Sequence, residues 1–242
     1  MKLGPKIVFL FNDPEGFGVA IAGALHPNPN SSLHRLEDLF ELSLEGYGIK
    51  DCKACGNLVH FVDDNAISQV SLLLLNTYEP PILVCAIKEV LAQIVVEMSA
   101  TTPKIIAPFV VASSKLKSGS KALASTGGKV SLYSVQIGAE TDVTSTLATR
   151  TQKPPSPMQI HYEPLSCFHQ LARVLKLPTS ILIGQRSQSL SDEALEEDIE
   201  TLNEIGELLA SSTSLCFLRE KVAWNPTKRS KNGEEPWRAL YG

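Results

Sequence analysis

The chain has 242 residues, of which 43% are hydrophobic and 20% are charged, and its formal net charge is −4. This size allows one large domain or two small ones, with an ordinary globular composition and enough chain to bury a core. The acidic balance excludes an overall basic field that would recruit nucleic acid or a membrane, and an aromatic content of 6% argues against a base-stacking surface.

The N-terminal apolar run stops at Asn12 and Asp13, and no cleavage-site pattern follows it, so we expect no signal peptide. The two longest apolar stretches, VSLLLL and PPILVCAIKEVLAQIVV, are too short or carry Lys and Glu, so neither is expected to span a bilayer. Five cysteines, an odd number, favour reduced thiols. We therefore expect a cytoplasmic protein, with the nucleus as a second compartment.

Apolar periodicity predicts three strands and one helix in the first third of the chain. Short apolar runs indicate buried strands at 6–11, 57–62 and 70–75. The segment 33–46 carries apolar residues at helical spacing, and Gly46 can end it, so we predict an amphipathic helix there. The residues of that apolar face are Leu33, Leu36, Leu39, Phe40 and Leu44.

A helix and a strand are predicted next. Residues 82–98 follow Pro80 and Pro81 and read as a mostly buried helix, because proline is tolerated in a first helical turn. Residues 104–112 predict a central strand. Pro108 lies within it and cannot donate a hydrogen bond to a neighbour, so an edge position or a bulge is expected there.

The second half begins with long loops and then becomes regular. Residues 113–157 are rich in Ser, Thr, Gly and Pro and predict surface loops that contain one strand at 130–137. A helix at 163–178 should end at a proline, a strand should follow at 180–184, and a helix at 189–211 should begin with a serine N-cap. These two terminal residues are Pro178 and Ser191.

Alternating strands and helices predict an α/β fold, a three-layer sandwich with a mixed, largely parallel sheet. No linker divides the chain, so residues 1–217 are expected to form a single α/β domain in which 113–157 is rich in loops. Residues 218–242 are expected to be a flexible basic C-terminal tail, and no further core element is expected after LCFLREKVAW, which ends at Trp224.

The segment after the first strand partly resembles a dinucleotide fingerprint. Gly16 and Gly18 occupy the first two glycine positions, but Ile21 occupies the third, where close packing needs Gly or Ala. The acidic residue about 20 positions on, Glu37, lies in a helical pattern rather than at a strand end. We favour a turn that needs glycine at positive φ, with nucleotide binding as the alternative.

Cysteine and histidine offer two further hypotheses. Cys52 and Cys55 have metal or redox spacing, but His60 is the nearest additional ligand and a structural zinc site needs four, so two ordinary thiols are favoured. Cys167 lies between His161 and His169, which leaves a Cys–His hydrolase as a hypothesis. A packed helical thiol is the favoured interpretation of Cys167.

Other catalytic motifs are missing from the sequence. There is no G-x-S-x-G, H-E-x-x-H or G-x-x-x-x-G-K-[ST] pattern, and STGGK at 125–129 precedes no helical pattern. We therefore expect no catalytic residue, no cofactor and no metal.

The last 25 residues differ from the rest, because they hold six basic residues against three acidic ones in an acidic chain. They end on Leu240, Tyr241 and the carboxylate of Gly242, an order that suits capture in a groove. Trp237 lies just before them and either joins the same partner surface or folds back on the body. These four residues are the predicted binding site.

Hydrophobic-Tyr-X endings are typical of factors that dock between α subunits of the proteasome core particle. The body, from VSLLLL through EVLAQIVVEM and KIIAPFVVASSKL to CFHQLARVLKLP and TSILIG, resembles the proteasome assembly chaperone family, on its chaperone 1 side. The chaperone 2 side stays open as an alternative. The match covers roughly residues 70–210, and the N-terminal quarter does not match.

This resemblance implies a fold similar to phosphorylase/hydrolase-like domains without the catalytic residues. It also implies a heterodimer with a chaperone 2-like partner and transient docking of Leu240, Tyr241 and Gly242 between α-ring subunits. An α/β enzyme such as a nucleoside phosphorylase or a hydrolase is the competing hypothesis, and it requires a polar pocket at the carboxyl ends of the strands, near Gly16–Gly18.

Overall fold

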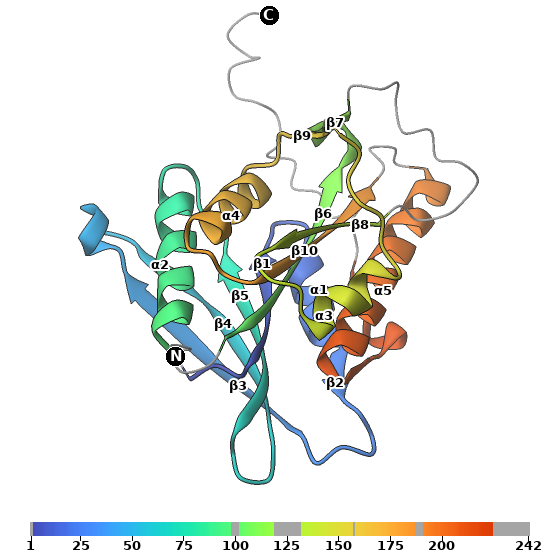
Figure 1. Cartoon of the computed structure of the whole chain (residues 1–242), viewed down its shortest axis with the longest axis horizontal. Helices are drawn as coiled ribbons and strands as arrows, with labels where there is room; N and C mark the ends of the chain where they lie inside the picture. The colour runs from blue at the N-terminus through green and yellow to red at the C-terminus, as the bar shows by residue number, and fades with distance from the viewer. Residues whose placement is uncertain (1, 98–101, 119–131, 157, 187–190, 225–242) are drawn as a thin grey trace, which may run out of the picture.

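A seven-stranded mixed sheet organises the chain (Figure 1). The computed structural model describes residues 2–97, 102–118, 132–156, 158–186 and 191–224. The order of the strands across the sheet is β3-β4-β5-β1-β6-β10-β8. Their bounds are β1 Lys6–Asn12, β3 His34–Ser43, β4 Lys53–Val62, β5 Ser68–Asn76, β6 Lys104–Ala112, β8 Leu132–Ile137 and β10 Thr179–Arg186.

The four central strands β5, β1, β6 and β10 are parallel, whereas β3, β4 and β8 join the sheet antiparallel at its two sides. Helices α2 and α4 cover one face, and α1, α3 and α5 cover the other, so the fold is the predicted three-layer α/β sandwich. The helices are α1 Phe17–Ala24, α2 Ile82–Glu97, α3 Asp142–Ala148, α4 Glu163–Val174 and α5 Asp192–Thr213.

Short elements complete the described chain. Two small two-stranded sheets pair β2 with β11 and β7 with β9. Their strands are β2 Leu25–Pro27, β11 Leu215–Phe217, β7 Leu116–Ser118 and β9 Met158–Ile160, and the single 3₁₀ turns are Glu45–Tyr47, Ser113–Lys115 and Arg219–Lys221.

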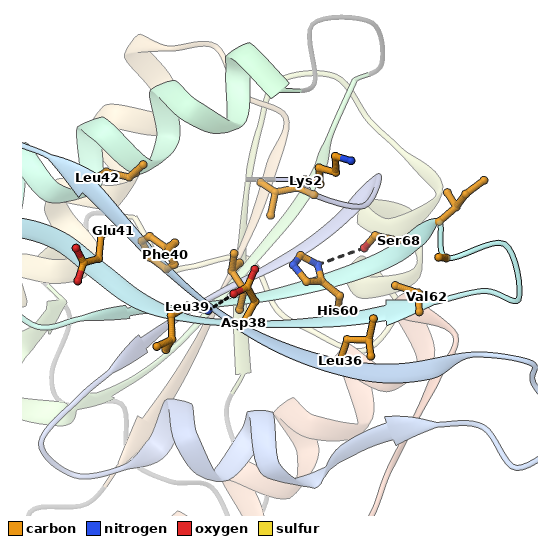
Figure 2. Close-up of a pocket in the computed structure, with 14 residues that line it drawn as sticks. Lys2, Leu36, Asp38, Leu39, Phe40, Glu41, Leu42, His60, Val62 and Ser68 are labelled. Carbon is orange, nitrogen blue, oxygen red and sulfur yellow. Dashed lines mark hydrogen bonds between the residues drawn. The ribbon is translucent and has the colours of Figure 1, made fainter.

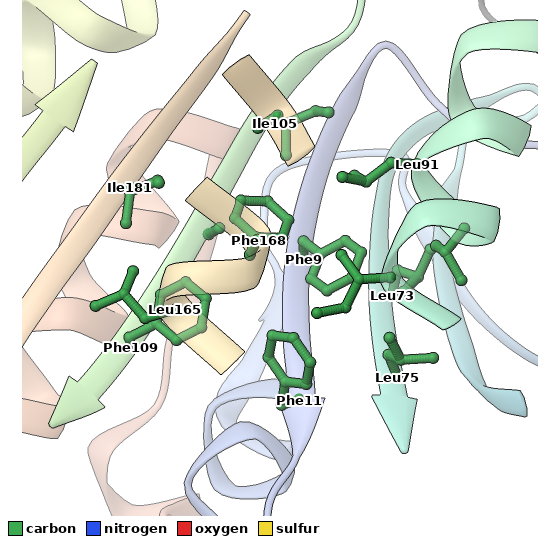
Figure 3. Close-up of a cluster of buried hydrophobic side chains, with 14 of the residues drawn as sticks. Phe9, Phe11, Leu73, Leu75, Leu91, Ile105, Phe109, Leu165, Phe168 and Ile181 are labelled. Carbon is green, nitrogen blue, oxygen red and sulfur yellow. The ribbon is translucent and has the colours of Figure 1, made fainter. Parts of the chain in front are cut away.

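The central strands read as continuous apolar runs because helices cover both of their faces. On the side of α2 and α4, an aromatic cluster lies between the sheet and the helices (Figure 3). The ring centroids of Phe9 and Phe168 are 4.8 Å apart, and those of Phe11 and Phe109 are 5.7 Å apart. Phe109 is also 6.4 Å from Tyr162, so the cluster extends from the core to the carboxyl end of the sheet.

Most of the predicted elements are confirmed. The runs at 6–11, 57–62, 70–75 and 180–184 lie in β1, β4, β5 and β10, and the predicted helices at 82–98, 163–178 and 189–211 correspond to α2, α4 and α5. The Ser191 side chain accepts a hydrogen bond from the amide of Ala194, so it is the N-cap of α5 as expected. Helix α4 ends at Val174, before Pro178.

The helix predicted at 33–46 is wrong, because His34–Ser43 form strand β3. Leu36, Phe40 and Leu44 are four residues apart, a spacing that places them on one face in a strand as well as in a helix. Ten residues of β3 pair with β4, and this ladder decides the conformation. Only Phe40 in the strand is buried, so β3 is an edge strand with a largely open surface.

Pro108 lies neither on an edge strand nor at a bulge, but at a local edge within a central strand. Strand β6 lies between β1 and β10, and its register with β10 continues without a shift from Ile105 to Ala112. Its ladder with β1 instead stops at Ile106, two residues before the proline, although β1 continues to Asn12. Because proline has no N–H to donate, β1 and β6 separate at this point.

Two segments expected to be irregular contain regular structure. Residues 113–157 hold β7 and α3 in addition to the predicted strand, which is β8, and a capping box between Thr141 and Thr144 starts α3. After residue 217, Trp224 is buried in the core. The expectation that no core element follows Trp224 concerns residues outside the described ranges. The domain boundary at 217/218 stays a prediction.

Candidate functional site

The four predicted binding residues, Trp237, Leu240, Tyr241 and Gly242, lie outside the described residues. The chain that leads to them can be followed as far as Trp224, which is 8% exposed. Its indole packs edge-on against Phe17 at the start of α1, with ring centroids 6.4 Å apart. Trp224, the last described residue before the predicted binding residues, therefore lies at the carboxyl end of the central strands.

A cavity of about 220 Å³ lies at that same end of the sheet, and we call it the switch-point cavity. The strand order changes direction between β1 and β6, because the chain leads from β1 to β5 on one side through β3 and β4, and then to β6 on the other. Open α/β sheets bind ligands at such a point. The cavity is lined by Phe11, Asp13, Pro14, Glu15, Phe17, Pro108, Phe109, Val110, Ala112, Lys115, Tyr162 and Arg186.

Pro108 belongs to the lining, so the separation of β1 from β6 contributes to opening the cavity. The walls are mainly apolar and aromatic. Phe11, Phe17 and Phe109 are each at least nine-tenths buried, and Tyr162 closes one side from the start of α4. Such walls suit a flat apolar group.

Asp13 occupies the N-terminus of α1. Its carboxylate accepts hydrogen bonds from the amides of Glu15, Phe17 and Gly18, at 2.9–3.2 Å. In dinucleotide-binding folds a phosphate takes this place at the first helix. Here the chain supplies its own anion, so the Asp13 carboxylate already occupies the amides of Phe17 and Gly18 that nucleotide binding through Gly16–Gly18 would offer to a phosphate.

The two glycines serve the turn itself, as the favoured interpretation of the sequence expected. Gly16 has φ of 76°, a left-handed conformation that glycine adopts without strain. A Cβ on Gly18 would lie 1.9 Å from the main-chain oxygen of Phe11, so the first helix approaches β1 as closely as only glycine allows.

Arg186 and Glu15 form an ion pair inside the cavity. The guanidinium reaches Glu15 through Nη2, whereas Nε and Nη1 are buried and have no hydrogen-bond partner in the described parts of the chain. Burial, together with the nearby charges of Asp13 and Glu15, raises the pKa of Tyr162 to about 12. Its hydroxyl therefore stays protonated at neutral pH.

A second hollow lies on the edge of the sheet, and we call it the edge trough (Figure 2). Its volume is about 780 Å³, and its floor is formed by β3 and β4. His60 in this floor binds Ser71 Oγ at 2.9 Å through Nδ1, and burial lowers the pKa of the imidazole. Leu36 and Leu39 on β3 are 52% and 72% exposed, so the trough has an apolar rim.

The cysteine hypotheses gain no support from the structure. Cys52 and Cys55 are free thiols, and no cluster of three or more metal-ligating side chains exists within the described ranges. Burial on α4 raises the pKa of Cys167, the opposite of what an activated nucleophile needs. No hydrogen bond joins Cys167 to a histidine in the described part of the chain. STGGK at 125–129 lies outside the described residues.

Sequence reasoning missed the members of the switch-point cavity. Asp13, Tyr162 and Arg186 come from three distant segments, and only the fold brings them together. The enzyme hypothesis had required a polar pocket near Gly16–Gly18, and this cavity meets that requirement in position. Within the described chain, no helix is both long and apolar enough to cross a membrane.

Comparisons with known proteins identify a family and a shared fold. The family model described as Domain of unknown function (DUF7894) matches residues 1–242. No curated protein matches the sequence.

Solved structures resemble the chain at low identity. A protein of unknown function from Thermoplasma acidophilum is 11% identical, with a TM-score of 0.53, and the match covers 90% of this chain and 81% of that one. A protein of unknown function from Corynebacterium glutamicum is 10% identical, with a TM-score of 0.52, and the match covers 92% of this chain and 79% of that one. PbaA of Pyrococcus furiosus, described as an archaeal homolog of proteasome-assembly chaperone, is 12% identical, with a TM-score of 0.47. That match covers 100% of this chain and 89% of PbaA. The first two likenesses establish the fold, and the TM-score of the third is too low to add to it.

Proposed function

We propose that this chain, which belongs to the family described as Domain of unknown function (DUF7894), is a non-catalytic chaperone for assembly of the proteasome core particle. The observation that carries the proposal is the open edge of the sheet. Strand β3 is ten residues long, pairs with β4 alone among the described strands, and exposes Leu36 and Leu39. A long apolar edge strand is a site where another protein chain can pair.

The edge fits a second α/β protein better than a small molecule. The amide of Leu39 binds the Asp38 carboxylate, and the other main-chain groups of β3 that face away from β4 offer donors and acceptors to an added strand. The trough beside them can receive side chains of the added partner. We therefore assign this edge to a heterodimer with a paralogous, chaperone 2-like subunit. The reverse assignment, in which this chain is itself the chaperone 2-type subunit, uses the same edge.

The C-terminal tail supplies the contact with the proteasome in this proposal. The sequence ending on Leu240, Tyr241 and Gly242 supports docking between α-ring subunits, in the way that the sequence resemblance implies. Trp224 anchors the start of the tail on the body, so binding of its tip would hold the folded domain against the ring. The mechanism is steric, because the chaperone covers the ring until the mature particle no longer favours it.

The interactions of the two carboxylates in the switch-point cavity disfavour the competing enzyme hypothesis. Asp13 is held by three main-chain amides and Glu15 by Arg186, so both are already engaged. A general acid or base needs a carboxylate that can exchange its proton with a substrate. The cavity thus favours binding over catalysis.

Affinity purification tests the proposal. The chain should carry an N-terminal tag, so that Gly242 keeps its free carboxylate, and the proteins that co-purify from cells should be identified by mass spectrometry. We expect α-ring subunits and a second α/β chaperone. Recovery of neither class would contradict the assembly function.

A double variant separates the edge from the tail. Leu36→Ser with Leu39→Ser should lose the second chaperone and keep the α subunits. Val174→Ser, on the exposed surface of α4 at 74% exposure, is the matched control and should lose neither. If Val174→Ser also loses the second chaperone, the result would contradict the assignment of β3 as the heterodimer interface.

A further inference from the structure

We propose that the switch-point cavity binds a small, flat, uncharged molecule, a heterocycle of one or two fused rings. The proposal concerns the body of the protein and is independent of the assembly function. Its starting point is position, because the cavity opens where the strand order changes direction between β1 and β6 and where Pro108 ends their pairing.

Shape decides the size and form of the ligand. A volume of about 220 Å³ accommodates a fragment-sized molecule and is below the usual range for drug-sized ligands. Three buried phenylalanines and Tyr162 form the walls, and the rings of Phe109 and Tyr162 stand edge to face at 79°. Aromatic walls favour a planar ring, which can stack or meet ring edges at these surfaces.

Charge decides that the ligand is neutral. The cavity holds two carboxylates, Asp13 and Glu15, and two cationic side chains, Lys115 and Arg186. Asp13 already fills the anion position at the start of α1, so a phosphate there would meet a like charge. An added cation would meet Arg186 and Lys115. A neutral molecule adds no charge to the two carboxylates and two cations of the cavity.

Hydrogen bonding explains why the ligand is polar at its rim. Nε and Nη1 of Arg186, whose side chain lines the cavity, are buried without a hydrogen-bond partner within the described segments, and Tyr162 belongs to the same lining. Buried polar groups are rarely left unpaired in folded proteins, so such groups point to a missing acceptor. A ring nitrogen or carbonyl oxygen of a heterocycle supplies one.

Saturation-transfer NMR on the full-length protein tests this proposal. Adenine and indole are the neutral flat probes, and AMP and indole-3-acetate are their anionic counterparts. We expect transfer to at least one neutral probe, with at least tenfold weaker binding of its anionic counterpart. Absence of transfer to both neutral probes, or equal binding of the anionic ones, would overturn the proposal.

Variants place the binding in the cavity. Ala112 lines it at the end of β6, so Ala112→Phe should fill it and abolish binding. Ala148→Phe, on the exposed last position of α3, is the matched control and should bind as the wild type does. Binding that persists in Ala112→Phe contradicts the proposed location.

Tyr162→Phe keeps the ring and removes the hydroxyl, and it serves if Ala112→Phe does not fold. Loss of one hydrogen bond should weaken the neutral probe about fivefold. Circular dichroism should show an unchanged fold. Unchanged affinity in this variant would overturn the role of the cavity's polar groups and with it the proposal.

Discussion

The indole nitrogen of Trp224 donates a hydrogen bond of 2.9 Å to the main-chain oxygen of Glu15. This contact joins residues 209 positions apart in the sequence, and it places the start of the C-terminal tail beside the switch-point cavity. The side chain of Glu15 pairs with Arg186 inside that cavity. One short turn after β1 therefore connects the body's cavity to the tail that we propose to dock on the proteasome.

Trp224→Ala should lower the free energy of unfolding by about 3–5 kcal/mol, because it removes a buried aromatic side chain and leaves a cavity. Urea unfolding followed by circular dichroism measures the change. Trp224→Phe is the matched variant, and it should cost less because it keeps most of the packing while losing a hydrogen bond worth about 1 kcal/mol. If Trp224→Ala lowers the free energy of unfolding by less than about 1 kcal/mol, Trp224 is not part of the core.

Two glycines in α1 should respond in opposite directions to alanine. Gly18→Ala should destabilise the protein by about 3 kcal/mol or more, because the new Cβ would meet the main-chain oxygen of Phe11 at 1.9 Å. Gly23→Ala meets nothing within 4 Å and should stabilise the helix by about 0.5–1 kcal/mol. Thermal unfolding of both variants checks this pair, and equal effects would refute the close approach of α1 to β1.

Stability should fall with acid below pH 6.5, partly because of His60. Burial lowers the pKa of its imidazole from the ordinary 6.5, so the unfolded chain takes up a proton before the folded one does. The stabilisation by neutral His60 is thus present above pH 6.5 and is lost as the pH falls toward the folded pKa. The pKa values of His26 and His169 are lowered as well and act in the same direction.

His60→Gln should flatten this pH dependence in part, since the two other histidines remain. Chemical unfolding at pH 7.5, 6.5 and 5.5 measures it for both proteins. His34→Gln, which changes an exposed histidine on β3, is the matched control. An identical slope for His60→Gln and wild type would remove His60 from the explanation.

The sequence predicts the parallel core of this fold well, because its strands and helices are buried and their periods are clear. Runs such as VSLLLL are apolar on both faces and leave no alternative to a covered strand. Strand β3 was missed for the opposite reason. It is exposed, Leu36 and Phe40 lie four positions apart, a spacing that fits both conformations, and only its pairing with β4 separates strand from helix.

The position of the candidate cavity could be predicted from the sequence, but the residues that line it could not. A ligand crevice at the carboxyl ends of the strands follows from the fold class, and Gly16 marks its neighbourhood. Pro108 carried a signal that was interpreted as an edge or bulge, whereas it ends a central ladder and lines the cavity. Arg186 and Tyr162 have no local pattern, since their role depends on contacts across the chain.

Docking of the C-terminal residues is tested most directly by measuring how purified proteasome α subunits bind the full-length chain and a chain that lacks Leu240–Gly242. Both proteins should show the same circular dichroism and the same unfolding transition, because the truncation leaves the described core, which includes Trp224, unchanged in sequence. The truncation should weaken binding by at least tenfold while the heterodimer with the second chaperone persists. Unchanged affinity of the truncated chain would contradict this docking.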